Sequence, residues 1–244
     1  MTTAIIVQAR MGSSRLPGKV MLDLAGKPVL QHVLERCRRI ASADVVVCAM
    51  PDEEASQALA DIARMTGAEC FFGSEFDVLS RYAGAARQVA ADTVMRVTSD
   101  CPLIDANICE RVLQLRRDDD LDYAANNMPP SFPHGLDCEA MSYAALDEAD
   151  RRATDSYDRE HVTPWLRRAC NRGNVAADRA GLDQLRWTLD YPEDLVFFRA
   201  VFAAADETQL DTLDGVLAVL ETTPSLSHLN AMHHRSVPTP GAQL

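Results

Sequence analysis

A short segment near the amino terminus concentrates groups that bind phosphate. Residues 8–19 read Gln-Ala-Arg-Met-Gly-Ser-Ser-Arg-Leu-Pro-Gly-Lys, so three cations lie among glycines and serines. Glycine lets the backbone approach a ligand closely, and successive backbone N–H groups can surround an anion. Arginine and lysine side chains can neutralise a triphosphate. A solvated basic loop is the alternative. The residues predicted to bind the nucleotide here are Ala9, Arg10, Gly12, Ser13, Arg15 and Lys19.

The spacing in this segment differs from that of a P-loop. Five residues separate Gly12 from Gly18, and Val20 rather than Ser or Thr follows Lys19. The cations are nevertheless well suited to a pyrophosphate leaving group, whose developing charge they would stabilise. We therefore expect catalytic roles for Arg10, Arg15 and Lys19.

Two aspartates are candidate ligands for Mg²⁺. Asp100 follows the apolar run 93–97, Asp190 follows the run 185–189, and a proline comes two residues after each of them. Magnesium sites that hold nucleotides use one or two carboxylates together with substrate phosphates. Each aspartate could instead cap the helix that follows it, although Asp105 is the better cap candidate for the first helix. We expect Asp100 and Asp190 to bind the metal, and Asp100 to be catalytic.

The elements that must position these groups alternate along the first hundred residues. Apolar runs that predict strands cover 4–7, 45–49, 70–72 and 93–97, and helical patterns separate them. This alternation predicts an α/β fold with a mostly parallel, doubly wound sheet covered on both faces. In such sheets ligands bind beyond the carboxyl ends of the strands, which places the loops after Ala9 and Val97 at the site.

The rest of the chain predicts a less regular arrangement. We expect strands near 122–128, 136–141 and 185–189 and helices near 104–115, 143–152, 156–169, 192–205 and 213–221. The chain has the length of one domain, residues 1–244. Within it, residues 128–182 are predicted to form a small lobe inserted over the mouth of the site. Residues 224–244 are predicted to form a tail that lies on the surface and ends loosely.

Composition excludes several classes of partner. The formal charge of −12 disfavours binding to nucleic acid, because an acidic surface repels phosphates. No apolar stretch approaches the length of a membrane span, and no signal segment opens the chain. The seven cysteines are widely spaced without a Cys-x-x-Cys pair, which is typical of reduced thiols. We expect a cytoplasmic protein without nucleic-acid or membrane partners.

The segment Arg10-Met11-Gly12-Ser13-Ser14-Arg15-Leu16-Pro17-Gly18-Lys19 resembles a known signature. This is Arg-x-Gly-Ser-x-Arg-Leu-Pro-x-Lys, found in the cytidylyltransferases that activate acidic sugars, and every fixed position is present. The family includes the CMP-Kdo and CMP-neuraminate synthetases and the spore coat polysaccharide biosynthesis protein F group. The resemblance is strongest to the last group and extends to about Phe202.

The resemblance implies a fold, a reaction and partners. The fold is that of the nucleotide-diphospho-sugar transferases. The reaction is the Mg²⁺-dependent transfer of CMP from CTP to a sugar-like acid, with release of pyrophosphate, for surface polysaccharide or glycan precursors. The family also implies a homodimer, a metal ligand at the position of Asp100, and a second one late in the chain, where Asp190 stands.

Further site residues are assigned through the same resemblance. Residues 72–82 resemble the segment that lies over the nucleobase, and residues 132–139 and 158–165 resemble the spore coat group. Thr98 stands where the better-known synthetases carry Gln, which leaves the preference for CTP open. The nucleotide-binding residues predicted in this way are Ser74, Asp77, Arg81 and Thr98. The predicted residues for the acidic substrate are His134, Asp137, Glu139, Arg159, Glu160 and His161.

Three other functions remain compatible with the sequence. One is a pyrophosphorylase that joins a sugar phosphate to another nucleotide. The second is a glycosyltransferase of similar sheet architecture, although a triphosphate loop would be superfluous in it. The third is a nucleotide-binding module without catalysis, against which the two placed aspartates argue.

Overall fold

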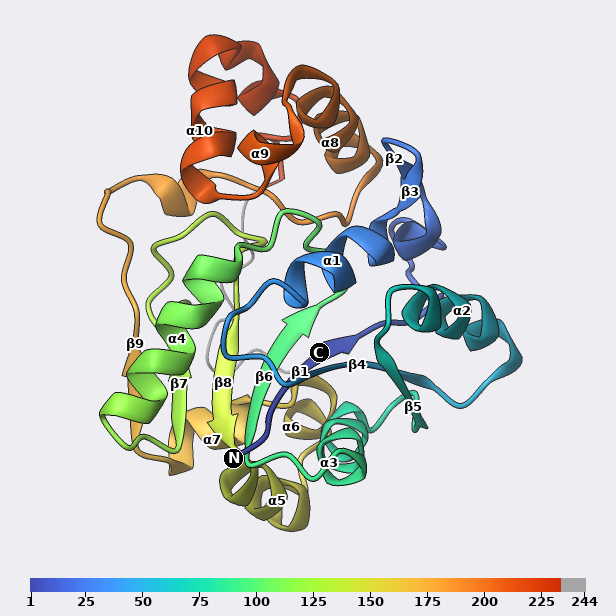
Figure 1. Ribbon diagram of the computed structural model, residues 1–244, viewed down its shortest axis with the longest axis vertical. Helices are drawn as coiled ribbons and strands as arrows, with labels where there is room; N and C mark the ends of the chain where they lie inside the picture. Colours follow the sequence, from blue (N-terminus) through green and yellow to red (C-terminus); the bar gives the residue numbers. More distant parts are fainter. Residues whose placement is uncertain (234–244) are drawn as a thin grey trace.

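The computed structural model describes residues 1–233 and is built on a seven-stranded sheet (Figure 1). The strand order is β5-β4-β1-β6-β8-β7-β9. The strands are β1 (Thr3–Gln8), β4 (Val45–Pro51), β5 (Glu69–Gly73), β6 (Thr93–Thr98), β7 (Tyr123–Ala125), β8 (Glu139–Ser142) and β9 (Arg172–Asn174). Within this sheet β8 alone runs antiparallel to its neighbours, so the expected mostly parallel sheet is confirmed. A separate hairpin joins β2 (Asp23–Leu24) to β3 (Lys27–Pro28).

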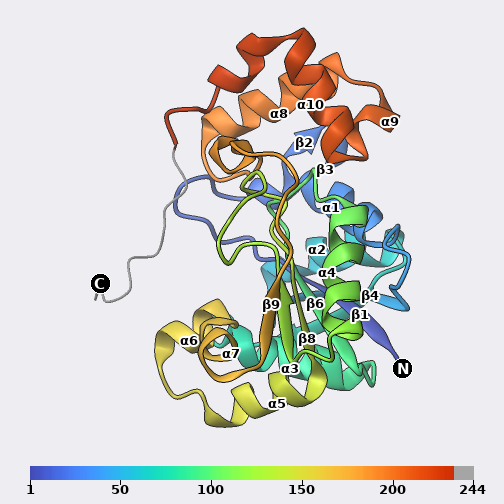
Figure 2. The same ribbon diagram turned by 90° about the vertical axis from the view of Figure 1, so that its left-hand side faces the viewer.

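Helices cover both faces of the sheet because alternate strand residues point to opposite sides. Ile5 and Val7 of β1 pack in one core with α1, α2 and α4, whereas Ala4 and Ile6 pack in a second core with α3, α5 and α7. Figure 2 shows α4 on one side of the sheet and α6 and α7 on the other. These helices are α1 (Val29–Cys37), α2 (Gln57–Met65), α3 (Val78–Gln88), α4 (Ala106–Asp118), α5 (Tyr143–Arg152), α6 (Ser156–His161) and α7 (Pro164–Ala169).

The last helices gather at one end of the molecule, beyond the end of β6 (Figure 1). They are α8 (Pro192–Ala204), α9 (Glu207–Leu210) and α10 (Leu213–Thr222). The short 3-10 helices are η1 (Lys19–Met21), η2 (Glu54–Ser56), η3 (Leu182–Gln184) and η4 (Pro224–His228). Across residues 1–233, none of the helices combines the length and the apolar character needed to cross a membrane.

The expected lobe at 128–182 is not a separate insertion. Its strand β8 lies inside the central sheet between β6 and β7, and α5 and α7 belong to the layer that covers one face. The helix expected over 156–169 is two helices, because the backbone at Val162 adopts a φ of 70° and Pro164 begins the next helix.

The late strand expected at 185–189 is also absent. Its backbone bonds to two different loops: Leu185 and Trp187 exchange two hydrogen bonds with His134, and the N–H of Leu189 donates to the carbonyl of Asp100. An isolated bridge at Arg186 is its sole strand-like pairing in the described chain. Asp190 is therefore delivered by a loop. Of the expected tail, η4 and the residues to 233 pack against the body, and 234–244 lie outside the described residues.

Candidate active site

The loop between β1 and η1 forms one side of the candidate active site. It folds back on itself because the N–H of Gly18 donates to the carbonyl of Met11 at 3.2 Å. Gly18 adopts a φ of 66°, a left-handed conformation that glycine reaches without steric cost. The N–H of Leu16 donates to Ser13 Oγ at 3.3 Å. Ala9 has a buried side chain, so only its backbone could contact a ligand.

The exposed part of this loop carries two of its cations. Arg10 and Arg15 are both exposed. The turn that precedes α3 faces the loop, since a Cβ built on Gly12 would lie 4.0 Å from Glu75 Oε1. The loop backbone is therefore open to a ligand on one side and adjoins the predicted nucleobase segment on the other.

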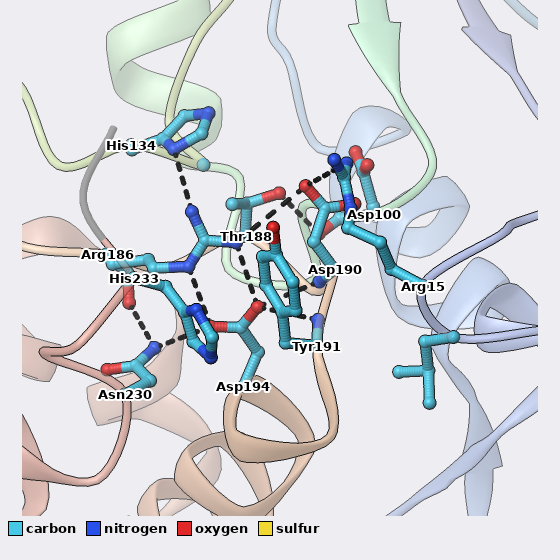
Figure 3. A network of polar contacts seen from close by, with 12 residues as sticks. Arg15, Asp100, His134, Arg186, Thr188, Asp190, Tyr191, Asp194, Asn230 and His233 are labelled. Carbon is cyan, nitrogen blue, oxygen red and sulfur yellow. Dashed lines mark hydrogen bonds and ion pairs between the residues drawn. The ribbon is translucent and has the colours of Figure 1, made fainter. Parts of the chain in front are cut away.

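The ammonium of Lys19 joins the two predicted metal ligands. Its Nζ donates to Asp100 Oδ2 at 2.7 Å and to Asp190 Oδ1 at 2.6 Å. Arg15 Nη2 lies 3.0 Å from Asp190 Oδ2, and Figure 3 shows Arg15, Asp100 and Asp190 side by side. The two carboxylates thus converge beside residues 8–19, named the phosphate loop after its predicted ligand. Their role as metal ligands stays a prediction.

Charge in this cluster is balanced internally. Burial acts to raise the pKa of Asp100, but the charge and hydrogen bond of Lys19, helped by Thr98, hold it at about 2. Burial acts to lower the pKa of Lys19, yet the two carboxylates outweigh it and raise that pKa. Asp100 and Asp190 thus surround the Lys19 ammonium, with the Arg15 guanidinium also on Asp190, an arrangement in which a divalent cation could replace the ammonium.

Asp194 anchors the loop that carries Asp190. It is fully buried, and Arg186 donates to both of its oxygens, from Nε at 2.8 Å and from Nη2 at 2.9 Å. Its Oδ2 also accepts from the backbone N–H of Asp190 and of Tyr191, each at 2.9 Å. The sequence indicates Asp194 only as an acid in the first turn of α8. Its place at the third position of a proline-started helix, where it completes a capping box, is the signal that identifies it.

The residues predicted to line the nucleobase chiefly shape their own turn. Asp77 caps α3 by accepting from Ser80 N, and Ser74 Oγ accepts from Asp77 N at 3.0 Å. Arg81 is 2% exposed and donates to the carbonyl of Ser74 at 2.5 Å. Thr98 Oγ1 lies 3.2 Å from Cys101 Sγ. The turn could therefore present backbone groups to a base, while these side chains are engaged with the protein.

Asp77 and Arg159 bind each other, although the sequence predicts that Asp77 binds the nucleotide and Arg159 the acidic substrate. Arg159 donates to Asp77 from Nε at 3.0 Å and from Nη2 at 2.6 Å. The same guanidinium contacts Asp150 Oδ1 at 2.7 Å and the Asp150 carbonyl at 2.5 Å. This ion pair joins the start of α3 to α5 and α6, which favours a structural role for Arg159 over substrate binding.

His134 lies closer to the predicted metal ligands. Gly135 has a φ of 117°, and a Cβ there would lie 2.0 Å from the carbonyl oxygen of Trp187, so glycine allows the two segments to touch. His134 Nδ1 then lies 3.4 Å from Arg186 Nη1, and Arg186 Nη2 lies 3.7 Å from Asp190 Oδ2. Asp137 Oδ2 lies 4.0 Å from His134 Nε2. These two residues are therefore placed beside the site.

The last two predicted substrate residues end α6. Glu160 and His161 are exposed. Burial of part of its ring lowers the pKa of His161, which favours a neutral imidazole at pH 7. The ring also lies 4.4 Å from that of Tyr157. Among residues 1–233, neither Glu160 nor His161 makes a hydrogen bond or an ion pair with Asp100 or Asp190.

Glu139 lies within the sheet at 1% exposure, away from any surface that a substrate reaches. Its carboxylate accepts from Arg96 at 2.6 Å, from Arg167 at 2.5 Å and from Thr163 at 2.8 Å, and also from the hydroxyl of Tyr123. Burial acts to raise the pKa of Glu139, but Arg96 and Arg167 hold it at about 2. The expected substrate-binding role is thus replaced by a buried ion network.

We expect Glu139→Ala to lower the free energy of unfolding by about 3–5 kcal/mol, because it leaves two arginines without their buried partner. The pKa in the folded state lies below the ordinary 4.5, so the stabilisation by Glu139 is present at neutral pH. It is lost as the pH falls from about 4.5 towards 2. Urea unfolding at several pH values measures both effects.

The matched control is Glu148→Ala, which breaks the exposed pair of Glu148 with Arg152 at 2.8 Å. Such surface pairs contribute about 0–1 kcal/mol. A stable Glu139→Ala protein with a raised KM for the acceptor would contradict the structural role and restore the substrate-binding one.

Comparison with known proteins agrees with this geometry. The profile described as cytidylyltransferase matches residues 4–195. Spore coat polysaccharide biosynthesis protein SpsF of Bacillus subtilis is 29% identical over 228 residues, which cover 90% of this chain and 94% of SpsF. The 3-deoxy-manno-octulosonate cytidylyltransferase of Escherichia coli is 36% identical over 147 residues, 59% of this chain and 54% of that protein. A solved cytidylyltransferase from Leptospira borgpetersenii serovar Hardjo-bovis is 28% identical, with a TM-score of 0.88 over 93% of this chain and 97% of that chain. The chain belongs to the cytidylyltransferase family.

Proposed function

We propose that the protein transfers CMP from CTP to a sugar-like acid and releases pyrophosphate, in the synthesis of a surface polysaccharide or glycan precursor. The observation that carries the proposal is the Lys19 ammonium held between Asp100 and Asp190 beneath the phosphate loop. Family membership and the similarity to an octulosonate cytidylyltransferase and to SpsF support the same reaction.

The residues of the loop act by positioning and by charge. The acceptor hydroxyl oxygen forms a bond to the α-phosphorus and releases its proton to solvent water, while the bond from that phosphorus to the oxygen of the β-phosphate breaks. Pyrophosphate leaves with the negative charge of the broken bond. Arg10, Arg15 and Lys19 lie on one loop, where they bind the β- and γ-phosphates and stabilise that charge. No protein nucleophile is needed.

Magnesium fits the same carboxylates. Both lie within hydrogen-bond distance of one ammonium, so a single cation can contact both. Among residues 1–233, no group of three or more His, Cys, Asp or Glu side chains could hold a metal ion. The nucleotide phosphates would therefore complete the coordination, as is usual for Mg²⁺. When bound by Asp100 and Asp190, Mg²⁺ would neutralise phosphate charge and polarise the α-phosphate.

The acceptor side of the site is assigned to His134 and Asp137. We expect His134→Ala to raise the KM for the acceptor by roughly 10-fold or more, because a contact to a charged group is lost. CTP affinity should stay near that of the wild type. Steady-state kinetics with the acceptor varied measures the change, and His228→Ala, at an exposed position, is the control. Equal kinetics in both variants would place the acceptor elsewhere.

Product analysis tests the proposed reaction directly. Pyrophosphate release is measured with each of the four ribonucleoside triphosphates against a panel of octulosonic and nonulosonic acids and of sugar 1-phosphates. We expect release with CTP and an acid, and a product whose ³¹P spectrum shows one phosphorus. Release that requires a sugar phosphate, with two phosphorus signals in the product, would establish a pyrophosphorylase instead.

The homodimer and the cytoplasmic location expected from the sequence remain predictions. The proposed reaction depends on neither, since the loop and both carboxylates come from one chain. Analytical ultracentrifugation of the purified protein measures the oligomeric state.

A further inference from the structure

The chain returns to the active site after α10, in a segment that the family profile does not cover. The profile ends at residue 195, whereas the segment spans residues 226–233. Leu226 packs in the main core, Asn230 is 2% exposed, and His233 is partly buried. Asn230 and His233 contact the segment that carries Asp190, so residues 226–233 do more than cover the surface.

Asn230 binds the anchor of that loop. Its Nδ2 donates to Asp194 Oδ1 at 2.9 Å and to the carbonyl of Arg186 at 3.0 Å. The other oxygen of Asp194 holds the backbone N–H groups of Asp190 and Tyr191. One buried carboxylate therefore links the side chain of Asn230 to the main chain of a predicted metal ligand (Figure 3).

His233 stacks on the ring of Tyr191, and that ring lies beside Arg15 of the phosphate loop. Its imidazole stacks on Tyr191 with 3.9 Å between the ring centroids and 4° between the planes, and its Nε2 lies 3.0 Å from Glu193 Oε2. The guanidinium of Arg15 lies 5.2 Å from the centroid of Tyr191, and Figure 3 shows the ring between His233 and Arg15. Arg15 in turn pairs with Asp190. The segment thus reaches Asp190 by two separate routes.

A segment that only covered the core would use apolar side chains at these positions. An apolar residue at 230 would leave the Arg186 carbonyl and one Asp194 contact unmet in a buried place, which costs free energy. The two polar contacts instead lead into the site. We infer that Asn230 and His233 are positioning residues for the nucleotide site, Asn230 acting on Asp190 through Asp194 and His233 acting on Arg15 through Tyr191. The inference rests on the proposed function, because it assigns these residues to binding of CTP and Mg²⁺.

The first test concerns Asn230→Ala. We expect the Mg²⁺ concentration that gives half-maximal turnover to rise roughly 10- to 100-fold, the range seen when a partner of a metal ligand is removed. The KM for the acceptor should not change. In the free protein, hydrogen exchange of the peptide 186–194 should become faster, since the amides of Asp190 and Tyr191 lose a fixed acceptor.

The control is Val112→Ala, at a fully buried position on α4, the helix that packs against β7, β8 and β9. It creates a cavity that lowers stability generally. Both variants are assayed well below their melting temperatures. If Val112→Ala changed the Mg²⁺ dependence and the exchange of 186–194 as much as Asn230→Ala did, the effect would be general loss of stability and the inference would fail.

The second test separates stacking from charge at position 233. His233→Ala should weaken CTP binding severalfold in calorimetric titration, and His233→Phe should restore it, because a phenyl ring can stack on Tyr191 without pairing with Glu193. Wild-type affinity in His233→Ala, together with an unchanged Mg²⁺ dependence in Asn230→Ala, would overturn the inference. Absence of CTP binding to the wild-type protein would instead overturn the proposed function.

Discussion

Asp100→Asn is expected to remove most turnover while the protein stays folded. The substitution keeps the size of the side chain and deletes one of the two charges that surround Lys19. Changing an outer partner of a metal site costs 10- to 100-fold, so loss of a direct ligand should lower turnover by more than about 100-fold. Lys19 keeps its contact with Asp190 at 2.6 Å, so the protein should stay folded, with a thermal midpoint lowered only by the lost ion pair with Asp100. Pyrophosphate release and thermal unfolding measure the two effects.

The control for this variant is Asp155→Asn. Asp155 caps α6 by accepting from Tyr157 N, and asparagine caps a helix about as well as aspartate. It should retain both stability and turnover. A fully active Asp100→Asn enzyme would leave Asp100 without a catalytic role and would remove the basis for the metal site.

The sheet was predictable because its central strands are continuous apolar runs. Ile5 and Ile6 are adjacent in the sequence and lie in different cores, a pattern that requires helices on both faces. The position of β8 was not predictable. It pairs with β6 across α4 and β7 and with β7 across a loop, and such pairing depends on packing that no local pattern encodes.

The phosphate loop and Asp100 lie at the same edge of the sheet, as their positions after two strands predict, because β1 and β6 run parallel. Asp190 reached the same place by another route. Its segment is not a strand, and two hydrogen bonds hold it there, from Leu189 N–H to the Asp100 carbonyl and from Asp190 N–H to the Asp194 carboxylate. The two aspartates expected to bind one metal therefore lie together, although the strand expected to carry Asp190 is absent.

Long-range side-chain pairs account for the assignments that the structure revises. The partners Asp77 and Arg159 are polar residues within segments that resemble family ligand segments, and either could face solvent or a ligand in the sequence alone. Glu139 has the same ambiguity until Arg96 is seen beside it in the neighbouring strand. Asn230 gives no local signal, because its partners lie far away along the chain.

Lys19→Met is expected to change two affinities in opposite directions. Methionine has a similar length and no charge, so the triphosphate loses a charge-assisted contact of about 1.5–3 kcal/mol. CTP should bind roughly 10- to 150-fold more weakly. Mg²⁺ alone should bind the free protein more tightly, because in the wild type it must displace an ammonium held at 2.7 Å by Asp100 and at 2.6 Å by Asp190. Separate calorimetric titrations with CTP and with Mg²⁺ measure both.

The opposite signs distinguish Lys19 from a structural lysine. Lys27→Met is the matched control, because Lys27 makes a half-buried pair with Glu35 at 2.8 Å and should alter neither affinity. Weaker binding of both ligands by Lys19→Met would mean that the ammonium only holds the two carboxylates in place. Tighter Mg²⁺ binding with unchanged CTP binding would mean that it neutralises the carboxylates and never reaches the phosphates. Only weaker CTP binding together with tighter Mg²⁺ binding fits a lysine that leaves Asp100 and Asp190 to the metal as it turns to the triphosphate.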